Sequence, residues 1–361
     1  MDHQSGSKNS RPGPRREFIG TLLSACLAAG LGAAPAAMAQ PSGMAGYTGP
    51  DRQQKLEEAA RKEDGLLIYT SATVEDMTVL IDAFEKKYGI KARLWRAGGE
   101  KVTQRTLTEA RAGRNEVDII ETDGIELEAL HREGALQPVK SPYQAELMEG
   151  AVRPHGDWTA TRLNVFAMAY NTNLIKKEEL PKTYEDLLDP RWKGRLGIEA
   201  EDLDWFATVN AELGEEKGLK LFRDMVEKNG ISVRKGHTLL TNLVASGEVP
   251  LALTVYNYKA EQLKNKGAPL DWFTIDPAIV RANGVALAKG APHPNAALLF
   301  FDFLLTDGQQ ILLERDFVTT SEKAQSKLNR MPLKFVDPAV VLDENAKWAG
   351  LYEDIFTKRS K

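Results

Sequence analysis

The sequence predicts an α/β protein with two lobes, each a mostly parallel sheet wrapped by helices. Three observations lead to this fold class. The chain has 361 residues, of which 42% are hydrophobic and 27% charged, as in ordinary folded proteins. A single hydrophobic core rarely grows beyond about 250–300 residues, so a chain of this length is expected to build two. Short apolar strands alternate with amphipathic helices along most of the chain, and this order is typical of parallel sheets covered by helices.

The first region of alternation has helices with one apolar face. Met77, Leu80, Ile81, Phe84 and Tyr88 recur at helical spacing, and Gly89 is the residue expected to end that helix. The apolar runs between the helices are short enough for buried strands. The predicted elements are strands at 66–69, 90–95 and 117–120, and helices at 56–63, 74–88, 100–112 and 125–132.

The second region of alternation follows from residue 162 onward. It opens with one long strand, and its last helix is the most apolar of the chain. No internal repeat of fixed period is present, so a solenoid is excluded. The predicted elements are strands at 162–170, 195–199, 231–233, 250–255, 271–275 and 285–288, and helices at 203–213, 215–228, 239–247, 258–266 and 295–305.

Composition and motifs exclude several classes of function. A net charge of −4 with no basic stripe argues against a nucleic-acid partner. The single cysteine excludes an internal disulfide and a cysteine-cluster metal site. The chain has no phosphate-binding P-loop, nucleophile elbow or zinc-protease helix, so it is not expected to be an enzyme. The histidines at 131, 155, 237 and 293 fit no ligand spacing and are expected to be surface or capping residues.

The first 39 residues have the pattern of an export signal. A basic stretch ending in Arg15 and Arg16 is followed by an apolar run, and a small-residue site precedes the predicted cleavage after Ala39. The paired arginines predict a twin-arginine signal, with a general secretion signal as the alternative. Cys26 offers a second alternative, because residues 23–26 (LSAC) resemble a lipobox. The mature protein is therefore expected in the periplasm.

Several sequence blocks resemble solute-binding proteins of ABC transporters. The resemblance runs from about residue 64 to 315 and is carried by residues 68–72 (IYTSA), 84–90 (FEKKYGI) and 117–123 (VDIIETD). The more specific blocks are residues 183–187 (TYEDL) and 189–195 (DPRWKGR), which resemble the ferric-iron-binding branch of that superfamily.

This resemblance implies the type II periplasmic-binding-protein fold, with the ligand in a cleft between the lobes. Lobe 1 is expected to comprise residues 56–161 and 276–318, and lobe 2 residues 162–275 and 319–361, after a flexible leader over 40–55. The partner would be an ABC permease in the inner membrane, and the protein is expected to be a monomer. The role of residues 320–361 is not predicted beyond helices that pack on lobe 2. A periplasmic sensor or an enzyme on the same fold are the alternatives.

Candidate binding residues follow the predicted strands, where ligands of open α/β sheets bind. Hydroxyls at a helix N-terminus favour an anion, although they also serve as helix caps. The acids that follow strand 195–199 favour the cationic part of a ligand, with a tryptophan as stacking wall, and an arginine in the crossover strand favours its phosphate or carboxylate. The candidates are Ser71, Thr73, Asp123, Arg162, Glu199, Asp204, Trp205, Tyr256, Asn257 and Tyr258.

The resemblance also implies how ferric iron would be bound. Relatives of that branch chelate Fe(III) with a histidine after the first strand, a carboxylate after the third and two adjacent tyrosines after a late strand. On this chain the histidine position falls on Thr73, the carboxylate on Asp123, and the tyrosine pair on Asn257 and Tyr258, with Tyr256 displaced by one residue. The ligand is therefore expected to be either Fe(III), held by Asp123, Tyr256 and Tyr258, or a small zwitterionic or anionic organic ion. No other cofactor is expected.

Overall fold

The computed structural model describes residues 43–358. The predicted export signal over residues 1–39, with its twin-arginine pair, its cleavage site and Cys26, lies outside the described residues.

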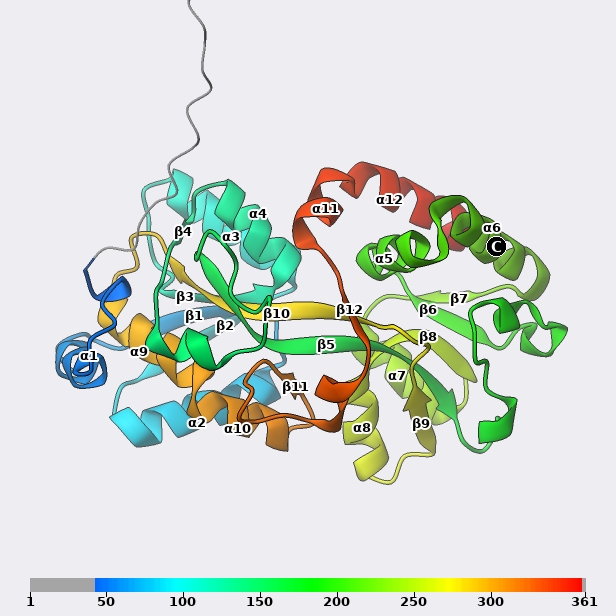
Figure 1. The fold of residues 1–361 in the computed structure, drawn as a ribbon, viewed down its shortest axis with the longest axis horizontal. Helices are drawn as coiled ribbons and strands as arrows, with labels where there is room; N and C mark the ends of the chain where they lie inside the picture. The colour runs from blue at the N-terminus through cyan, green and yellow to red at the C-terminus, as the bar shows by residue number, and fades with distance from the viewer. Residues whose placement is uncertain (1–42, 359–361) are drawn as a thin grey trace, which may run out of the picture. The chain divides into compact units, whose positions relative to one another are not determined.

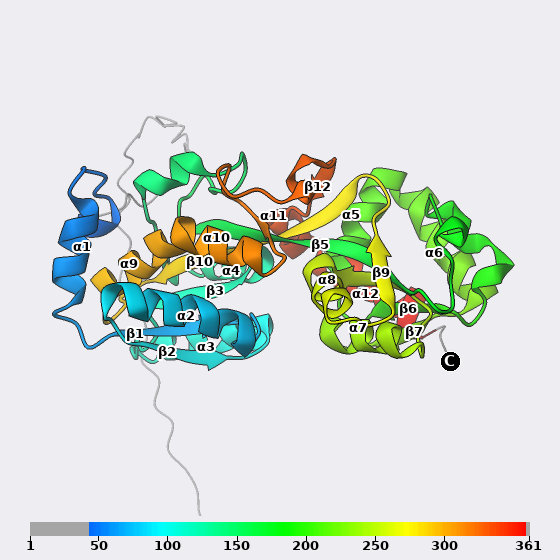
Figure 2. The ribbon, with the colours of Figure 1, turned by 90° about the horizontal axis from the view of Figure 1, so that it is seen from below.

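Two long strands, β5 (Trp158–Asn171) and β10 (Ala278–Ala288), organise the sheet. They pair antiparallel with each other, and the strand order is β2-β1-β3-β10-β5-β8-β6-β7. β10 pairs with β3 on its other edge, whereas the last part of β5 pairs with β8 and β9. Figure 1 shows how these two strands run between two groups of elements, and Figure 2 shows the same arrangement from below. We call the group around β1–β3 the first half and the group around β6–β8 the second half.

The first half surrounds its own hydrophobic core. Strands β1, β2 and β3 are parallel, as predicted. Helix α9 lies entirely inside this core from Ala296 to Leu305, and Phe84 of α2 meets the edges of two of its rings, Phe300 and Phe303. The elements are α1 (Arg52–Ala60), β1 (Leu66–Thr70), α2 (Val74–Tyr88), β2 (Ala92–Arg96), α3 (Gly99–Arg111), β3 (Ile119–Asp123), α4 (Gly124–Arg132), β4 (Leu136–Gln137), α9 (Pro294–Leu305) and α10 (Asp307–Glu314).

The second half surrounds a separate core rich in aromatic side chains. β6 is parallel to both β7 and β8. Phe206 and Phe222 lie at the centre, with rings 5.4 Å apart. The elements are β6 (Leu196–Glu199), α5 (Leu203–Leu213), α6 (Glu215–Asn229), β7 (Ser232–Arg234), α7 (His237–Ser246), β8 (Leu251–Tyr256), α8 (Asn257–Asn265) and β9 (Leu270–Phe273).

The C-terminal segment contacts both halves. β11 (Val318–Thr319) pairs with β5, and β12 (Leu333–Phe335) adds to β10 in parallel. Helix α11 (Pro338–Asp343) packs against α4 of the first half, where Arg132 forms an ion pair with Asp343 at 2.6 Å. Helix α12 (Asn345–Tyr352) then packs against α5 of the second half, with Trp348 and Tyr352 beside Phe206. The segment therefore ties α4 to the second core.

Several stretches differ from the sequence prediction. The helices of residues 320–361 were expected to pack on lobe 2, but α11 packs against α4 of the first half. The leader expected to be flexible over residues 40–55 is helical from Arg52, because the Arg52 guanidinium is buried and forms an ion pair with Asp302 of α9 at 2.7 Å. Strand β10 begins at Ala278 rather than at 285, because it stays paired with β5 through a register shift between Asn283 and Gly284, where Thr161 of β5 is the extra residue.

No single helix within residues 43–358 is long and apolar enough to cross a membrane. Helices α9 and α10 reach that length and composition only as a pair bent by 53°.

Candidate functional site

The candidate site lies where the parallel strands of both halves end and helices begin. In the first half, β1, β2 and β3 lead into α2, α3 and α4. In the second half, β6, β7 and β8 lead into α5, α7 and α8. Helix N-termini present free backbone N–H groups, so each of these turns brings polar side chains and partial positive charge to the same edge of its sheet.

The residues predicted at the end of β1 serve mainly as local caps. Thr73 is the N-cap of α2, and its hydroxyl accepts the Asp76 backbone N–H at 3.2 Å. Ser71 Oγ accepts a hydrogen bond from Thr122 Oγ1 at 2.9 Å, which links the ends of β1 and β3. Arg315 of the loop after α10 pairs with Asp76 at 2.5 Å, so the N-terminus of α2 already has an ionic partner.

Asp123 and Glu126 bring two carboxyl groups to the start of α4. Asp123 Oδ1 caps the helix by accepting the backbone N–H groups of Ile125 and Glu126, each at 3.2 Å. Helix α3 approaches them closely at Gly99, where a Cβ atom would lie only 2.9 Å from Asp123 Oδ2 and 3.0 Å from Glu126 Cγ. Glycine at position 99 therefore lets α3 pack this closely against the two carboxyl groups.

Both carboxyl groups hold protons more tightly than usual. Burial raises the pKa of Asp123 above its ordinary value, against the opposing effect of Arg281. Burial and the negative charge of Asp123 raise the pKa of Glu126 to about 7, although the Thr103 hydroxyl donates to its carboxylate. Two neighbouring carboxyl groups that are largely shielded from water favour a cation between them.

Arg281 of β10 is the central residue that sequence reasoning missed. Its Nε and Nη2 bind the two oxygens of Asp204 at 2.5 Å each, and its Nη1 donates to the Tyr256 hydroxyl at 2.7 Å. Asp202 lies 3.5 Å from Nη2. The only signal in the sequence was a charged residue inside an otherwise apolar strand. Strand β10 thus places a guanidinium beside Asp202, which precedes α5, and Asp204, which lies in its first turn.

Glu199 and Asp202 lie beside His237 at the ends of β6 and β7. Glu199 accepts the backbone N–H of Gly236 at 2.7 Å, and burial together with Asp202 raises its pKa. Burial works to raise the pKa of Asp202, but His237 and Arg281 outweigh it and hold that pKa below its ordinary value. The His237 ring stacks on Tyr256 with centroids 3.8 Å apart, and its Nε2 lies 3.1 Å from Asp202 Oδ1.

The predicted tyrosines follow β8 as expected, but they have different neighbours. Strand β8 ends at Tyr256, whose phenol binds Arg281, and burial raises the pKa of that phenol well above its ordinary value. Tyr258 packs on Phe317 with ring centroids 4.1 Å apart, and burial raises its pKa to about 12. The two tyrosine rings lie 6.0 Å apart. Asn257 is buried and accepts the Val165 backbone N–H at 3.3 Å.

Arg162 and Trp205 have partners inside the protein. Arg162 is 4% exposed and forms an ion pair with buried Glu121. Trp205 is 2% exposed and contacts the rings of Tyr184 and Phe222 in the second core. The structure therefore gathers Asp123, Asp204 and Tyr256 around Arg281, whereas Arg162 and Trp205 are engaged elsewhere.

Comparison with known proteins places this arrangement in a family. The family model for bacterial extracellular solute-binding proteins matches residues 71–311, which is most of the chain. The chain belongs to this family. Members are the substrate-binding components of ABC importers and bind solutes rather than convert them.

This solute-binding protein has distant relatives with named ligands. It is 24% identical over 296 residues to "Iron uptake protein A1" of Synechocystis sp., covering 78% of this chain and 82% of the relative. It is 25% identical over 294 residues to the "Fe(3+)-binding periplasmic protein" of Serratia marcescens, covering 78% and 86%.

Solved structures show the same fold. Iron-bound HitA from Pseudomonas aeruginosa matches the solute-binding protein with a TM-score of 0.72 at 24% identity, covering 81% of this chain and 99% of HitA. AfuA from Actinobacillus pleuropneumoniae, with fructose-6-phosphate bound, matches with a TM-score of 0.71 at 23% identity over the same shares. The predicted two-lobed type II periplasmic-binding-protein fold is thus confirmed. The two structures hold very different ligands, so the fold alone does not select the solute.

Proposed function

We propose that this solute-binding protein captures a small zwitterionic organic ion, with the cationic group of that ion between Asp123 and Glu126. The two carboxyl groups supply the negative charge, and α3 packs closely beside them at Gly99. A bound ammonium would favour the ionised form of both acids, so binding is expected to release protons and to tighten as the pH rises through about 7.

The observation that carries this proposal is the position of Arg281. Its guanidinium is paired with Asp204 and donates to the Tyr256 hydroxyl, and it contributes a fixed positive charge beside one of the three groups expected to bind iron. A tyrosine binds Fe(III) as phenolate, but burial raises the pKa of Tyr256 well above its ordinary value. This arrangement therefore favours an organic solute over a trivalent cation that needs Tyr256 as phenolate.

Ferric iron is the second candidate, favoured by the names of the relatives. Two of them are described as an iron uptake protein and an Fe(3+)-binding protein. Under this alternative Asp123, Tyr256 and Tyr258 would be the iron ligands, and Arg281 would have to release the Tyr256 hydroxyl.

The first test is a thermal-shift panel with the mature chain. We expect at least one aminophosphonate, amino acid, betaine or thiamine to raise the melting temperature, more at pH 8 than at pH 6. Ferric citrate is expected to give neither a shift nor a tyrosinate–iron absorption band. A band accompanied by a raised melting temperature would overturn the organic ligand in favour of iron.

Matched glycine variants locate the ligand. Gly99→Ala places a methyl group against Asp123 Oδ2, whereas a Cβ atom at Gly98 meets nothing within 4 Å. We expect Gly99→Ala and Asp123→Asn to abolish the ligand-induced shift and Gly98→Ala to keep it. Equal shifts in all three variants would move the ligand away from α4.

Export and domain organisation are part of the same proposal. We propose that residues 1–39 direct export by the twin-arginine route, with cleavage after Ala39, and that Cys26 is removed with the signal. The proposed lobes are residues 56–161 with 276–318 and residues 162–275 with 319–361, and the separate hydrophobic cores support this division. The protein would act as a monomer that closes on its ligand and delivers it to an inner-membrane permease.

A further inference from the structure

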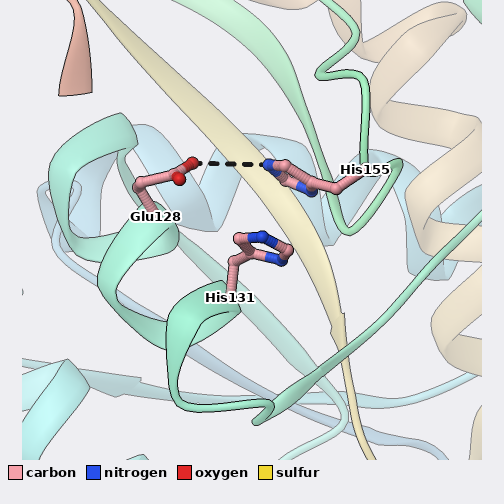
Figure 3. Close-up of side chains that lie close together, drawn as sticks. All are labelled: Glu128, His131 and His155. Atoms are coloured by element: carbon pink, nitrogen blue, oxygen red, sulfur yellow. Dashed lines mark hydrogen bonds and ion pairs between the residues drawn. The ribbon is translucent and has the colours of Figure 1, made fainter. Parts of the chain in front are cut away.

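A second cluster of ionisable side chains lies on the C-terminal part of α4, outside the candidate ligand site. Glu128 and His131 are three residues apart on this helix and so share one face. His155 and Asp157 come from the loop before β5. Figure 3 shows the Glu128 carboxylate and both imidazole rings close together, with the interaction between Glu128 and His155 drawn as a dashed line. The sequence placed these histidines far apart, and only the fold unites them.

The side chains approach one another as closely as metal ligands do. One oxygen or nitrogen atom from each of Glu128, His131 and His155 lies within 4.8 Å of the others. Glu128 Oε2 and His155 Nε2 are 3.3 Å apart, and the two imidazole rings stack with centroids 3.7 Å apart. Glu128 is buried, and His155 faces its carboxylate.

Asp157 prepares His131 to bind a metal. Its carboxylate lies against His131 Nδ1, which places the ring proton on Nδ1 and leaves the lone pair of Nε2 free. A carboxylate that orients the far nitrogen of a histidine in this way is the usual supporting contact in metal sites.

We propose that Glu128, His131 and His155 bind a divalent transition metal ion of borderline softness, such as Zn²⁺. Two imidazole nitrogens and one carboxylate oxygen are a ligand set that zinc accepts, with water in the fourth position. Hard cations such as Mg²⁺ and Ca²⁺ prefer oxygen ligands only, so they are excluded by the two nitrogens.

Binding requires a local rearrangement of His155. Its Nδ1 accepts the Asp157 backbone N–H at 3.0 Å, so the ring proton lies on Nε2 and faces Glu128. To bind a metal, the proton on Nε2 must leave that nitrogen, the Asp157 contact must break, and the rings must turn out of their stack. The loop before β5 therefore moves when the metal binds, while α4 keeps its place.

The charge around the cluster favours a cation. Glu128 and Asp157 contribute two carboxylates, and two opposing charges are nearby: Arg132, with its Nε 3.8 Å from Glu128 Oε1, and Arg153. Arg132 also pairs with Asp343 of α11, so its charge is shared with a second acid. The site shares no residue with the proposed ligand site and does not depend on it.

The test is a zinc titration of the metal-free full chain against a chromophoric chelator. We expect stoichiometric binding of one zinc ion here, weakened at least tenfold by His131→Gln and by His155→Gln and about tenfold by Asp157→Asn. His293→Gln is the matched control, because His293 pairs with Asp118 in the same half, and it should change affinity less than twofold. Circular dichroism melts of the zinc-free variants verify folding.

Cobalt substitution gives a second readout that a merely structural role would not change. Co²⁺ bound to these ligands should give a visible d–d absorption that both His131→Gln and His155→Gln remove. The proposal is overturned if zinc fails to bind, if both variants bind like the unaltered protein, or if only His237→Gln weakens binding. The last result would place the metal at the group formed by Glu199, Asp202 and His237.

Discussion

Arg281 shows how one residue decides the character of the site. Its guanidinium is 14% exposed and binds Asp204 through two parallel hydrogen bonds, with Asp202 and the Tyr256 hydroxyl on its remaining sides. Asp204 and Asp202 are both 1% exposed; Asp204 depends on this cation for its charge, whereas Asp202 also has His237 beside it. A buried charge left without its partner costs far more than the pair itself contributes.

Replacing Arg281 should therefore be strongly destabilising. We expect Arg281→Met to lower the free energy of unfolding at pH 7 by about 3–5 kcal/mol in urea denaturation, because it leaves the buried Asp204 carboxylate unpaired. The matched control is Lys334→Met, which removes an exposed ion pair to Glu212 and should cost at most about 1 kcal/mol. Adding Asp204→Asn to Arg281→Met should recover part of the loss. Equal effects of Arg281→Met and Lys334→Met would contradict the assigned role.

Glu126 predicts a stability change with pH. Its pKa is about 7 in the folded protein against 4.5 for an ordinary glutamate, so the folded state binds the proton more tightly. Stability then falls as the pH rises from about 4.5 through about 7, because the unfolded state loses its proton first. We expect Glu126→Gln to stabilise the protein at pH 8 by about 1–2 kcal/mol and to have no effect near pH 4. A difference between variant and parent that is the same at both pH values in urea denaturation would refute the shift.

For single residues, the sequence predicted where the site residues lie better than it predicted what each of them does. Asp204 and Tyr256 lie together as expected, because they follow the parallel strands β6 and β8, whose ends meet at one sheet edge, and Asp123 faces the same guanidinium from the end of β3 in the first half. The role of Arg281 was not predicted, because no local sequence pattern indicates which arginine in a strand is functional. Its partners are acids 77 and 79 residues away in the sequence. Trp205 faces the second core rather than solvent, which the helical spacing of its apolar neighbours could have indicated.

At the scale of elements, local signals located most helices and strands to within a few residues. The predicted helix at 203–213 agrees with α5, and Gly89 ends α2 with a positive φ of 72°. The predicted boundaries were wrong where tertiary contacts determine the ends of an element. β10 continues past Asn283 and Gly284 because Thr161 of β5 takes up the register shift there, and α1 extends to Arg52 because a buried ion pair holds it. The C-terminal helices have short apolar stretches whose partners, α4 for α11 and α5 for α12, lie far away in the sequence.

The C-terminal segment is expected to contribute to the second core. Phe356 is fully buried and its ring lies 5.3 Å from Phe206 and 5.8 Å from Phe222. We expect Phe356→Ala to lower the free energy of unfolding by about 3–5 kcal/mol, through lost burial and the cavity it leaves. Phe335→Ala, at a residue 36% exposed on β12, is the control and should cost less than about 1 kcal/mol. Similar losses in the two variants would show that the segment is not packed as described.

At the scale of the whole molecule, length alone predicted two cores, and the structure has one on each side of the crossing strands. What length does not predict is how firmly the cores are joined. All 14 residues of β5 are buried, and the strand pairs with β10 and β11 at one end and with β8 and β9 at the other. Neither half can unfold its sheet without freeing part of a strand that the other half uses.

This continuity predicts that the two halves unfold together. Phe222→Ala should leave a cavity in the second core and lower the free energy of unfolding by about 3–5 kcal/mol. The opening free energy of the β1 amides in the first half should fall as well. Native-state hydrogen exchange followed by mass spectrometry can measure it, since the opening free energy of the β1 amides should fall by the same amount as that of the β8 amides. Phe84→Ala in the first core is the reciprocal variant and should lower protection in β8 equally. If each variant lowers protection only in its own half, β5 and β10 act as a hinge between independently stable lobes, and the unfolding free energies predicted above apply to one lobe at a time.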